Sequence, residues 1–251
     1  MAQKKPNILI IYSDQHNAKT MGFMGHPDVR TPNFDKLAKS GVAFTRAYCP
    51  DAICAPSRNS FMSGLYPRTL GILNNGENTS VLNEVVSMAT VFKMNGYKTY
   101  TFGKRHTVKN IDEGWDVKKS HLAFESPENN YVKWIAEQGY AKEFAQDWAT
   151  EFGVGPQSGE YQKVKIPSAP MGTRVSALPD DKTMEAYTAQ ETIKMIEEQS
   201  KIDQPFFCWA TFYRPHQPYN PQPRFMSMYD ISSWGEGTKY GSSIKMPVSL
   251  R

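Results

Sequence analysis

The stretch "PDAICAPSRNSFMSG", residues 50–64, places Cys54 four positions before Arg58. A cysteine side chain can act as a nucleophile, and an arginine binds the oxygens of anions through its planar guanidinium. Each residue also has a structural explanation: Cys54 as a small buried apolar side chain, and Arg58 as a solvated charge on a helix. The pair therefore predicts chemistry on an anionic group only if other reactive side chains gather around it.

Further polar side chains follow three apolar runs of the chain. They are Asp14 and Gln15 after the first run, Lys104 and His106 after the second, and His216 after the third. Open α/β sheets bind ligands at the carboxyl ends of their strands, so these side chains are expected to surround one pocket with Cys54 and Arg58. Taken singly, Asp14 also fits a turn, and each histidine fits a hydrogen-bonded structural role.

The cysteines exclude several other kinds of site. Cysteine-dependent phosphatases leave five residues between cysteine and arginine, whereas three separate Cys54 from Arg58. The chain has only three cysteines, with no CxxC pair and no histidines at zinc-finger spacing. A disulfide framework and a structural zinc site are therefore not expected.

The elements that position these residues follow from the apolar periodicity. Strands are expected within residues 7–15, 42–49, 97–106 and 205–219, and helices within 31–41, 80–95 and 183–200. Alternating strands and helices predict an α/β fold with a mostly parallel central sheet and helices on both faces.

Two segments carry more detailed expectations. In helix 31–41, Thr31 is expected as the N-cap and Gly41 as the end, with Phe34, Leu37 and Ala38 on one face. Residues 115–179 are rich in aromatic residues, Gly and Pro, with weak helical stretches, and are interpreted as an insertion that covers the site.

Composition limits the partners. The 251 residues include 39% hydrophobic residues, and 29 Lys and Arg stand against 25 Asp and Glu, a net charge of +4 without basic runs. Anionic ligands are compatible with this charge, and nucleic acid is not expected. The apolar run near residue 8 is too short for a signal sequence or a membrane span, which predicts a cytoplasmic protein as written, or a periplasmic or secreted one if a leader was removed.

Four segments together resemble the type I sulfatase family of the alkaline-phosphatase-like superfamily. "CAPSRNSFMSG" is similar to its Cys-x-Pro-Ser-Arg signature, and "GYKTYTFGKRH" to its second signature. "NILIIYSDQ" resembles its opening strand, and "FYRPHQPY" its Pro-His-x-Pro-Tyr segment. The resemblance covers residues 7–221 and implies an alkaline-phosphatase-like sandwich, of which residues 1–251 form an incomplete N-terminal catalytic domain.

The resemblance also implies a mechanism. Cys54 is oxidised to formylglycine by a maturation enzyme, and the aldehyde hydrates to a diol. One hydroxyl attacks sulfur and expels the alcohol; the second then loses its proton, which ejects sulfate. Ca²⁺, with Mg²⁺ as the alternative, is expected on Asp14, Gln15 and position 54. Catalytic roles are expected for Cys54, Arg58, Lys104, His106 and His216.

The sequence departs from the family in three ways. Gln15 and Arg105 stand where relatives usually carry Asp and an aromatic residue, and the second pair of metal ligands is missing after Tyr219. Weak Ca²⁺ binding and an uncovered sheet edge that favours self-association are therefore expected. The expected substrate is a sulfated small molecule or carbohydrate. Phosphonate monoester or phosphodiester hydrolysis, and a non-catalytic anion-binding remnant, are the alternatives.

Overall fold

The structure is a computed structural model that describes residues 4–76, 84–119, 129–152 and 175–230. Its strands are β1 (Ile8–Ser13), β2 (Lys98–Gly103), β3 (Val117–Lys119) and β4 (Phe206–Phe212). Its α-helices are α1 (Pro32–Ser40), α2 (Cys54–Ser63), α3 (Pro67–Leu70), α4 (Met88–Met94), α5 (Asn130–Glu137), α6 (Ala141–Phe152), α7 (Met184–Gln199) and α8 (Pro223–Met226). Short 3₁₀ turns lie at Ala18–Thr20, Gly22–Met24 and Asp180–Lys182. Within these ranges, every helix is too short or too polar to span a membrane.

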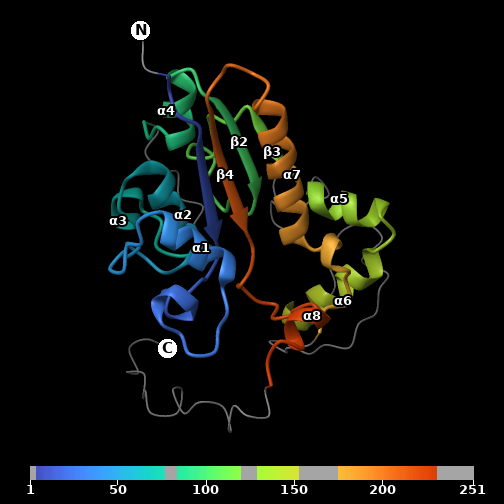
Figure 1. The fold of residues 1–251 in the computed structure, drawn as a ribbon. Helices are drawn as coiled ribbons and strands as arrows, with labels where there is room; N and C mark the ends of the chain where they lie inside the picture. The colour runs from blue at the N-terminus through green and yellow to red at the C-terminus, as the bar shows by residue number, and fades with distance from the viewer. Residues whose placement is uncertain (1–3, 77–83, 120–128, 153–174, 231–251) are drawn as a thin grey trace.

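The sheet has four strands in the order β1-β4-β2-β3, and every neighbouring pair is parallel (Figure 1). The register pairs Ser13 of β1 with Phe212 of β4, and Gly103 of β2 with Thr211 of β4. The carboxyl ends of β1, β2 and β4 therefore lie together at one end of the sheet. This arrangement confirms the predicted α/β class and places the residues after β1, β2 and β4 side by side.

Helices cover both faces of the sheet. On one face, α2 and α4 pack with Phe207 and Trp209 of β4 around a core that includes Met62 and Ile111. On the other face, Met195 of α7 packs against a second cluster from β2 and β4. Side chains alternate between the faces of a strand, so β4, buried along almost its whole length, supplies both cores.

The described part of segment 115–179 includes α5 and α6. Their apolar faces pack with α7 in a third cluster, which contains Tyr131, Trp148 and Tyr213. Figure 1 shows these helices beside α7, at the side of the sheet near β3. The short strand β3, which was not expected, also lies in this segment. That the segment covers the site stays a prediction.

One sequence-based expectation is wrong, and two others hold with differences of detail. Residues 42–49 form no strand, and Val42 and Phe44 are 80% and 81% exposed, because no neighbouring strand within the described ranges pairs with them. Helix α1 forms as expected and ends at Gly41, although none of its residues is buried and Phe34 and Leu37 are 38% and 61% exposed. Thr31 is the N-cap residue of α1, as expected, but its hydroxyl accepts from the Gly22 N–H and donates to Asp35 instead of accepting from an N–H of the helix. The predicted helix 80–95 is found only in its second half, as α4, which begins after Ser87. The Ser87 hydroxyl caps it by accepting from the Thr90 N–H. Residues 80–83 lie outside the described ranges.

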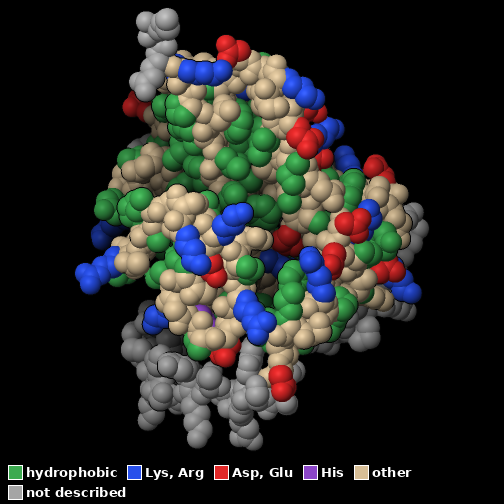
Figure 2. Space-filling model, in the orientation of Figure 1, with side chains coloured by type: hydrophobic (Ala, Val, Ile, Leu, Met, Phe, Trp, Pro, Cys, Tyr) green, Lys and Arg blue, Asp and Glu red, His purple; other side chains and the backbone are tan. Residues whose placement is uncertain are grey.

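Among the residues that the structure describes, strand β1 forms one edge of the sheet, and Leu9 and Ile11 on it are 38% and 55% exposed. Figure 2 shows hydrophobic side chains gathered over this part of the molecule. An edge strand with exposed apolar side chains offers unpaired backbone groups to another chain.

We expect the 251-residue chain to self-associate through β1 and Ile11→Lys to weaken that association, because a lysine on an edge strand opposes pairing. Sedimentation velocity across a concentration series measures the effect, with stability changed by about 1 kcal/mol at most. Ile193→Lys is the matched control, since Ile193 of α7 is also 55% exposed. Equal effects of the two substitutions would contradict an edge-strand contact.

Candidate active site

Cys54 is the first residue of α2, at the positive end of the helix. The Ala55 N–H donates to the side chain of Asn75 at 2.9 Å, which anchors this end. The half-buried Cys54 sulfur lies 3.8 Å from Asp14 Oδ1 and 3.8 Å from Lys104 Nζ. The residue therefore sits between a carboxylate and an ammonium group that come from two different strand ends.

Asp14 directly follows β1, and its backbone N–H donates to the Phe212 carbonyl at 3.0 Å. Its side chain is buried and accepts from Lys104 Nζ at 2.5 Å, with Arg58 Nη2 at 3.7 Å. Burial alone would raise the pKa of Asp14, but the charges of Arg58 and Lys104 outweigh it and hold that pKa below its ordinary value. The carboxylate is therefore ionised at neutral pH.

Arg58 is fixed in the core rather than solvated. It is 1% exposed, its Nη1 donates to Thr211 Oγ1 at 3.0 Å and to the Lys104 carbonyl, and its guanidinium lies 4.9 Å from the centre of the Tyr12 ring. Two cations, Arg58 and Lys104, thus face the single carboxylate of Asp14. This arrangement of two cationic side chains around one carboxylate suits an anionic ligand.

Gly103, the last residue of β2, brings Lys104 into this group. Its φ is +88°, and a Cβ there would lie 1.8 Å from the carbonyl oxygen of Thr211. Gly103→Ala is therefore expected to push β2 away from β4, displace Lys104 and destabilise the fold by about 3 kcal/mol or more. Chemical denaturation measures the loss. Gly139→Ala is the control, because Gly139 also has positive φ but nothing lies within 4 Å of an added Cβ.

His216 belongs to the same group, and His106 lies near enough to be affected by the charges of Lys104, Arg58 and Asp14. His216 contributes a ligand atom to a cluster with Asp14 and Cys54 in which the ligand atoms all lie within 4.8 Å of one another. Its Nδ1 lies 2.7 Å from the Gln217 carbonyl, which can only accept, so Nδ1 carries the proton. Burial and the charge of Lys104 lower the pKa of His216, and also that of His106, although part of His106 is exposed. Both imidazoles are therefore neutral at pH 7.

Two neighbours of the site have distinct positions. Gln15 is exposed, has a φ of 56°, and its amide nitrogen donates to the Tyr219 hydroxyl at 3.4 Å, which leaves the carbonyl oxygen out of that contact. Arg105 is buried and pairs with Asp112 at 2.8 Å. Arg105 therefore supports the loop after β2 and does not supply charge to the Cys54 group.

Three supporting residues were not anticipated. The Thr211 hydroxyl on β4 accepts a hydrogen bond from Arg58 and donates one to the Lys104 carbonyl. It therefore fixes the positions of Arg58 and Lys104 relative to each other. The Tyr213 ring lies 4.7 Å from Lys104 Nζ and 4.6 Å from the His216 ring. Asn59, fully buried on α2, accepts from the Val108 N–H and fixes the loop that carries His106. Because side chains alternate between the two faces of a strand, the sequence could have predicted that Thr211 and Tyr213 lie on the same face as the site.

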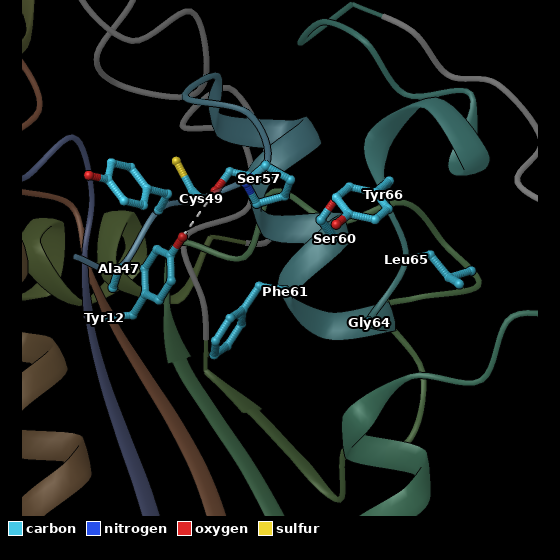
Figure 3. A pocket seen from close by; sticks show the side chains of 11 residues that line it. Tyr12, Ala47, Cys49, Ser57, Ser60, Phe61, Gly64, Leu65 and Tyr66 are labelled. Carbon is cyan, nitrogen blue, oxygen red and sulfur yellow. Dashed lines mark hydrogen bonds between the residues drawn. The ribbon is translucent and has the colours of Figure 1, made fainter. Parts of the chain in front are cut away.

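The other cysteines differ from Cys54. Burial raises the pKa of the Cys208 thiol to about 12, so this residue is an inert part of β4. Cys49 is exposed and lines an open hollow of about 670 Å³ along α2, together with Tyr12, Ser57 and Phe61 (Figure 3). None of the predicted catalytic or metal-binding residues lines this hollow.

Both the sequence and the fold of the chain are similar to those of known proteins. The Sulfatase family model matches residues 6–239, which is most of the chain. The chain belongs to the sulfatase family. Its similarity to the superfamily extends to three dimensions: the crystal structure of the phosphonate monoester hydrolase of Agrobacterium radiobacter superposes with a TM-score of 0.71 at 25% identity, over 91% of this chain and 44% of that one.

Sulfatase relatives are similar along nearly the whole chain. A sulfatase of Formosa agariphila is 28% identical over 91% of this chain and 43% of its own length. Human iduronate 2-sulfatase is 25% identical over 90% of this chain and 38% of its own length. The chain thus spans about two fifths of the length of these curated relatives, and the resemblance found in the four sequence segments is confirmed at the level of the family.

Proposed function

We propose that this chain carries the nucleophile-bearing part of a sulfuric ester hydrolase, with Cys54 converted to formylglycine. The observation that carries the proposal is the position of Cys54 at the start of α2, 3.8 Å from both Asp14 and Lys104. Membership of the sulfatase family supports it. A nucleophile beside an excess of positive charge is suited to attack on an ester that bears an anionic group.

Each residue has a role in this reaction. Lys104 and Arg58 neutralise charge on the sulfate oxygens. The hydrogen bonds of Thr211 hold both residues in place as that charge develops. His216 or His106, each neutral, takes the proton of one diol hydroxyl as that oxygen forms a bond to sulfur; the bond from sulfur to the alcohol oxygen breaks, and the histidine passes the proton to the alcohol. The second hydroxyl then loses a proton, the carbon–oxygen bond to sulfate breaks, and the aldehyde returns.

Calcium is the expected metal of the matured site. Ca²⁺ prefers hard oxygen ligands, and Asp14 and a diol at position 54 would offer them together, with the Gln15 carbonyl as a further candidate. When bound, the ion would supply positive charge next to the nucleophile. The thiol of unmodified Cys54 does not suit it. Lys104 and Arg58 already compensate Asp14, which supports the expectation of weak Ca²⁺ binding by this chain alone.

Sulfated carbohydrate is the substrate class that we propose. Relatives named ulvan-active sulfatase and iduronate 2-sulfatase support it. The similarity to a phosphonate monoester hydrolase favours a second candidate, because the charge around Cys54 does not distinguish sulfate from phosphonate.

The test begins with peptide mass spectrometry across residues 50–64 after coexpression with a formylglycine-generating enzyme. Aldehyde is expected at position 54 and not at position 49. Matured protein is then assayed in parallel with an aryl sulfate and an aryl phosphonate monoester. Sulfate turnover that requires the aldehyde supports the proposal, and preferential phosphonate turnover would replace it. Absence of both activities in matured protein would leave an anion-binding remnant.

A further inference from the structure

We propose that, before any oxidation of Cys54, the same end of the sheet holds a zinc ion on Cys54, His216 and Asp14. The three residues come from distant parts of the chain, yet their ligand atoms all lie within 4.8 Å of one another. Sulfur, imidazole nitrogen and carboxylate oxygen are the donors that Zn²⁺ prefers, whereas Ca²⁺ takes oxygen ligands. The proposal concerns the unmodified chain and does not rest on the formylglycine reaction.

The distances fit a tetrahedral ion. With zinc bonds of about 2.3 Å to sulfur and about 2.0 Å to oxygen, the two donors of a tetrahedral site are about 3.5 Å apart. Cys54 Sγ and Asp14 Oδ1 are 3.8 Å apart. The largest separation in the group, at most 4.8 Å, requires a shift of about 1 Å, which a small side-chain rotation provides.

A backbone contact gives His216 the tautomer that a metal ligand needs. Its Nδ1–H donates to the Gln217 carbonyl at 2.7 Å, so Nε2 carries the free lone pair. Histidines that bind metals usually donate their other N–H to a carbonyl or carboxylate in this way, which fixes the tautomer and the ring. The backbone thus provides the supporting contact that a zinc-bound imidazole requires.

Asp14 is supported in a similar way. Oδ2 accepts from Lys104 at 2.5 Å, while Oδ1 is the oxygen nearer to Cys54. Oδ2 is therefore held by a hydrogen bond, whereas Oδ1 has only the longer ion pair with Arg58 Nη2, 3.7 Å away, and remains open to the ion. The positive charges of Lys104 and Arg58 oppose a further cation. Zinc overcomes this opposition by displacing the thiol proton, so that a thiolate and a carboxylate together balance its charge.

The experiment uses the 251-residue chain with Cys54 shown by intact mass to be unmodified. Co²⁺ is titrated as a spectroscopic probe, and Zn²⁺ is then added in competition. A thiolate-to-cobalt charge-transfer band at one equivalent, lost on adding Zn²⁺ and not on adding Ca²⁺, is expected. Cys54→Ser should abolish the band and weaken zinc binding about 100-fold, and His216→Gln should weaken zinc binding at least tenfold.

Cys49→Ser is the matched control, because Cys49 is an exposed thiol outside the cluster. It should leave the band and the zinc affinity unchanged. Circular dichroism of each variant establishes that it is folded. A band that survives in folded Cys54→Ser, a band lost in Cys49→Ser, or the absence of stoichiometric zinc binding would each overturn the proposal. None of these outcomes bears on sulfate turnover by matured protein, so the two proposals fail separately.

Discussion

Cys54→Ala is expected to lower sulfate ester hydrolysis by matured protein about 10³-fold or more, because alanine lacks the thiol whose oxidation converts the β-carbon to the aldehyde, so the nucleophilic diol cannot be made. The substitution deletes one half-buried sulfur at the start of α2 and leaves the ion pairs among Asp14, Arg58 and Lys104 in place. Turnover of an aryl sulfate at saturating substrate measures the loss. Thermal unfolding is expected to change little.

Cys49→Ala provides the matched control for this substitution. Cys49 lies five residues upstream, is exposed, and lacks the Pro and Arg context that follows Cys54. Its activity should equal that of the unaltered chain. Sulfatase activity retained by Cys54→Ala, in a preparation whose parent is active, would show that another group is the nucleophile.

Asp14→Asn is expected to lower the free energy of unfolding by about 3 kcal/mol, the second large effect. The substitution keeps the shape of the side chain but removes the charge that compensates Arg58 and Lys104, whose side chains are 1% and 12% exposed. Breaking a buried pair from one side leaves unpaired charge in a poorly solvated place. Urea denaturation at pH 7 gives the measurement.

Asp203→Asn is the control for charge removal at a solvated site. Asp203 pairs with Lys4 at 2.6 Å, but both side chains are more than four fifths exposed, so water replaces the interaction. No measurable change in stability is expected. Comparable losses for Asp203→Asn and Asp14→Asn would contradict the view that burial makes the Asp14 pairs important.

The effect of Asp14 should depend on pH in a definite direction. Because the pKa of Asp14 is lowered on folding, its contribution to stability is complete above the pKa of an unfolded aspartate, about 3.9. It is lost as the pH falls through the lower pKa of the folded state. The difference in stability between the unaltered chain and Asp14→Asn should therefore shrink below pH 4. A difference that stays constant in this range would exclude an ionised Asp14 as its source.

The sequence by itself determined the elements whose signals are local. Strands β1, β2 and β4 and helix α7 follow the predicted apolar runs, because alternation and helical spacing are written directly in neighbouring residues. The parallel α/β class followed from their order. The sequence also predicted which residues would gather at the site, because the carboxyl ends of the strands in such sheets lie together. These residues are Asp14, Cys54, Arg58, Lys104 and His216. The functional roles of these residues stay predictions.

Tertiary structure alone decided what depends on neighbours far away in the chain. Residues 42–49 have a strand-like pattern but form no strand, because pairing requires a partner strand and the described residues provide none. Arg105 faces Asp112 rather than the site, which its position between Lys104 and His106 could not indicate. The three donors of the proposed zinc site, Asp14, Cys54 and His216, lie far apart in the sequence and form no spacing motif. Its members are brought together only by the register of β1 with β4 and the placement of α2, because metal ligation depends on distances in space and not along the chain.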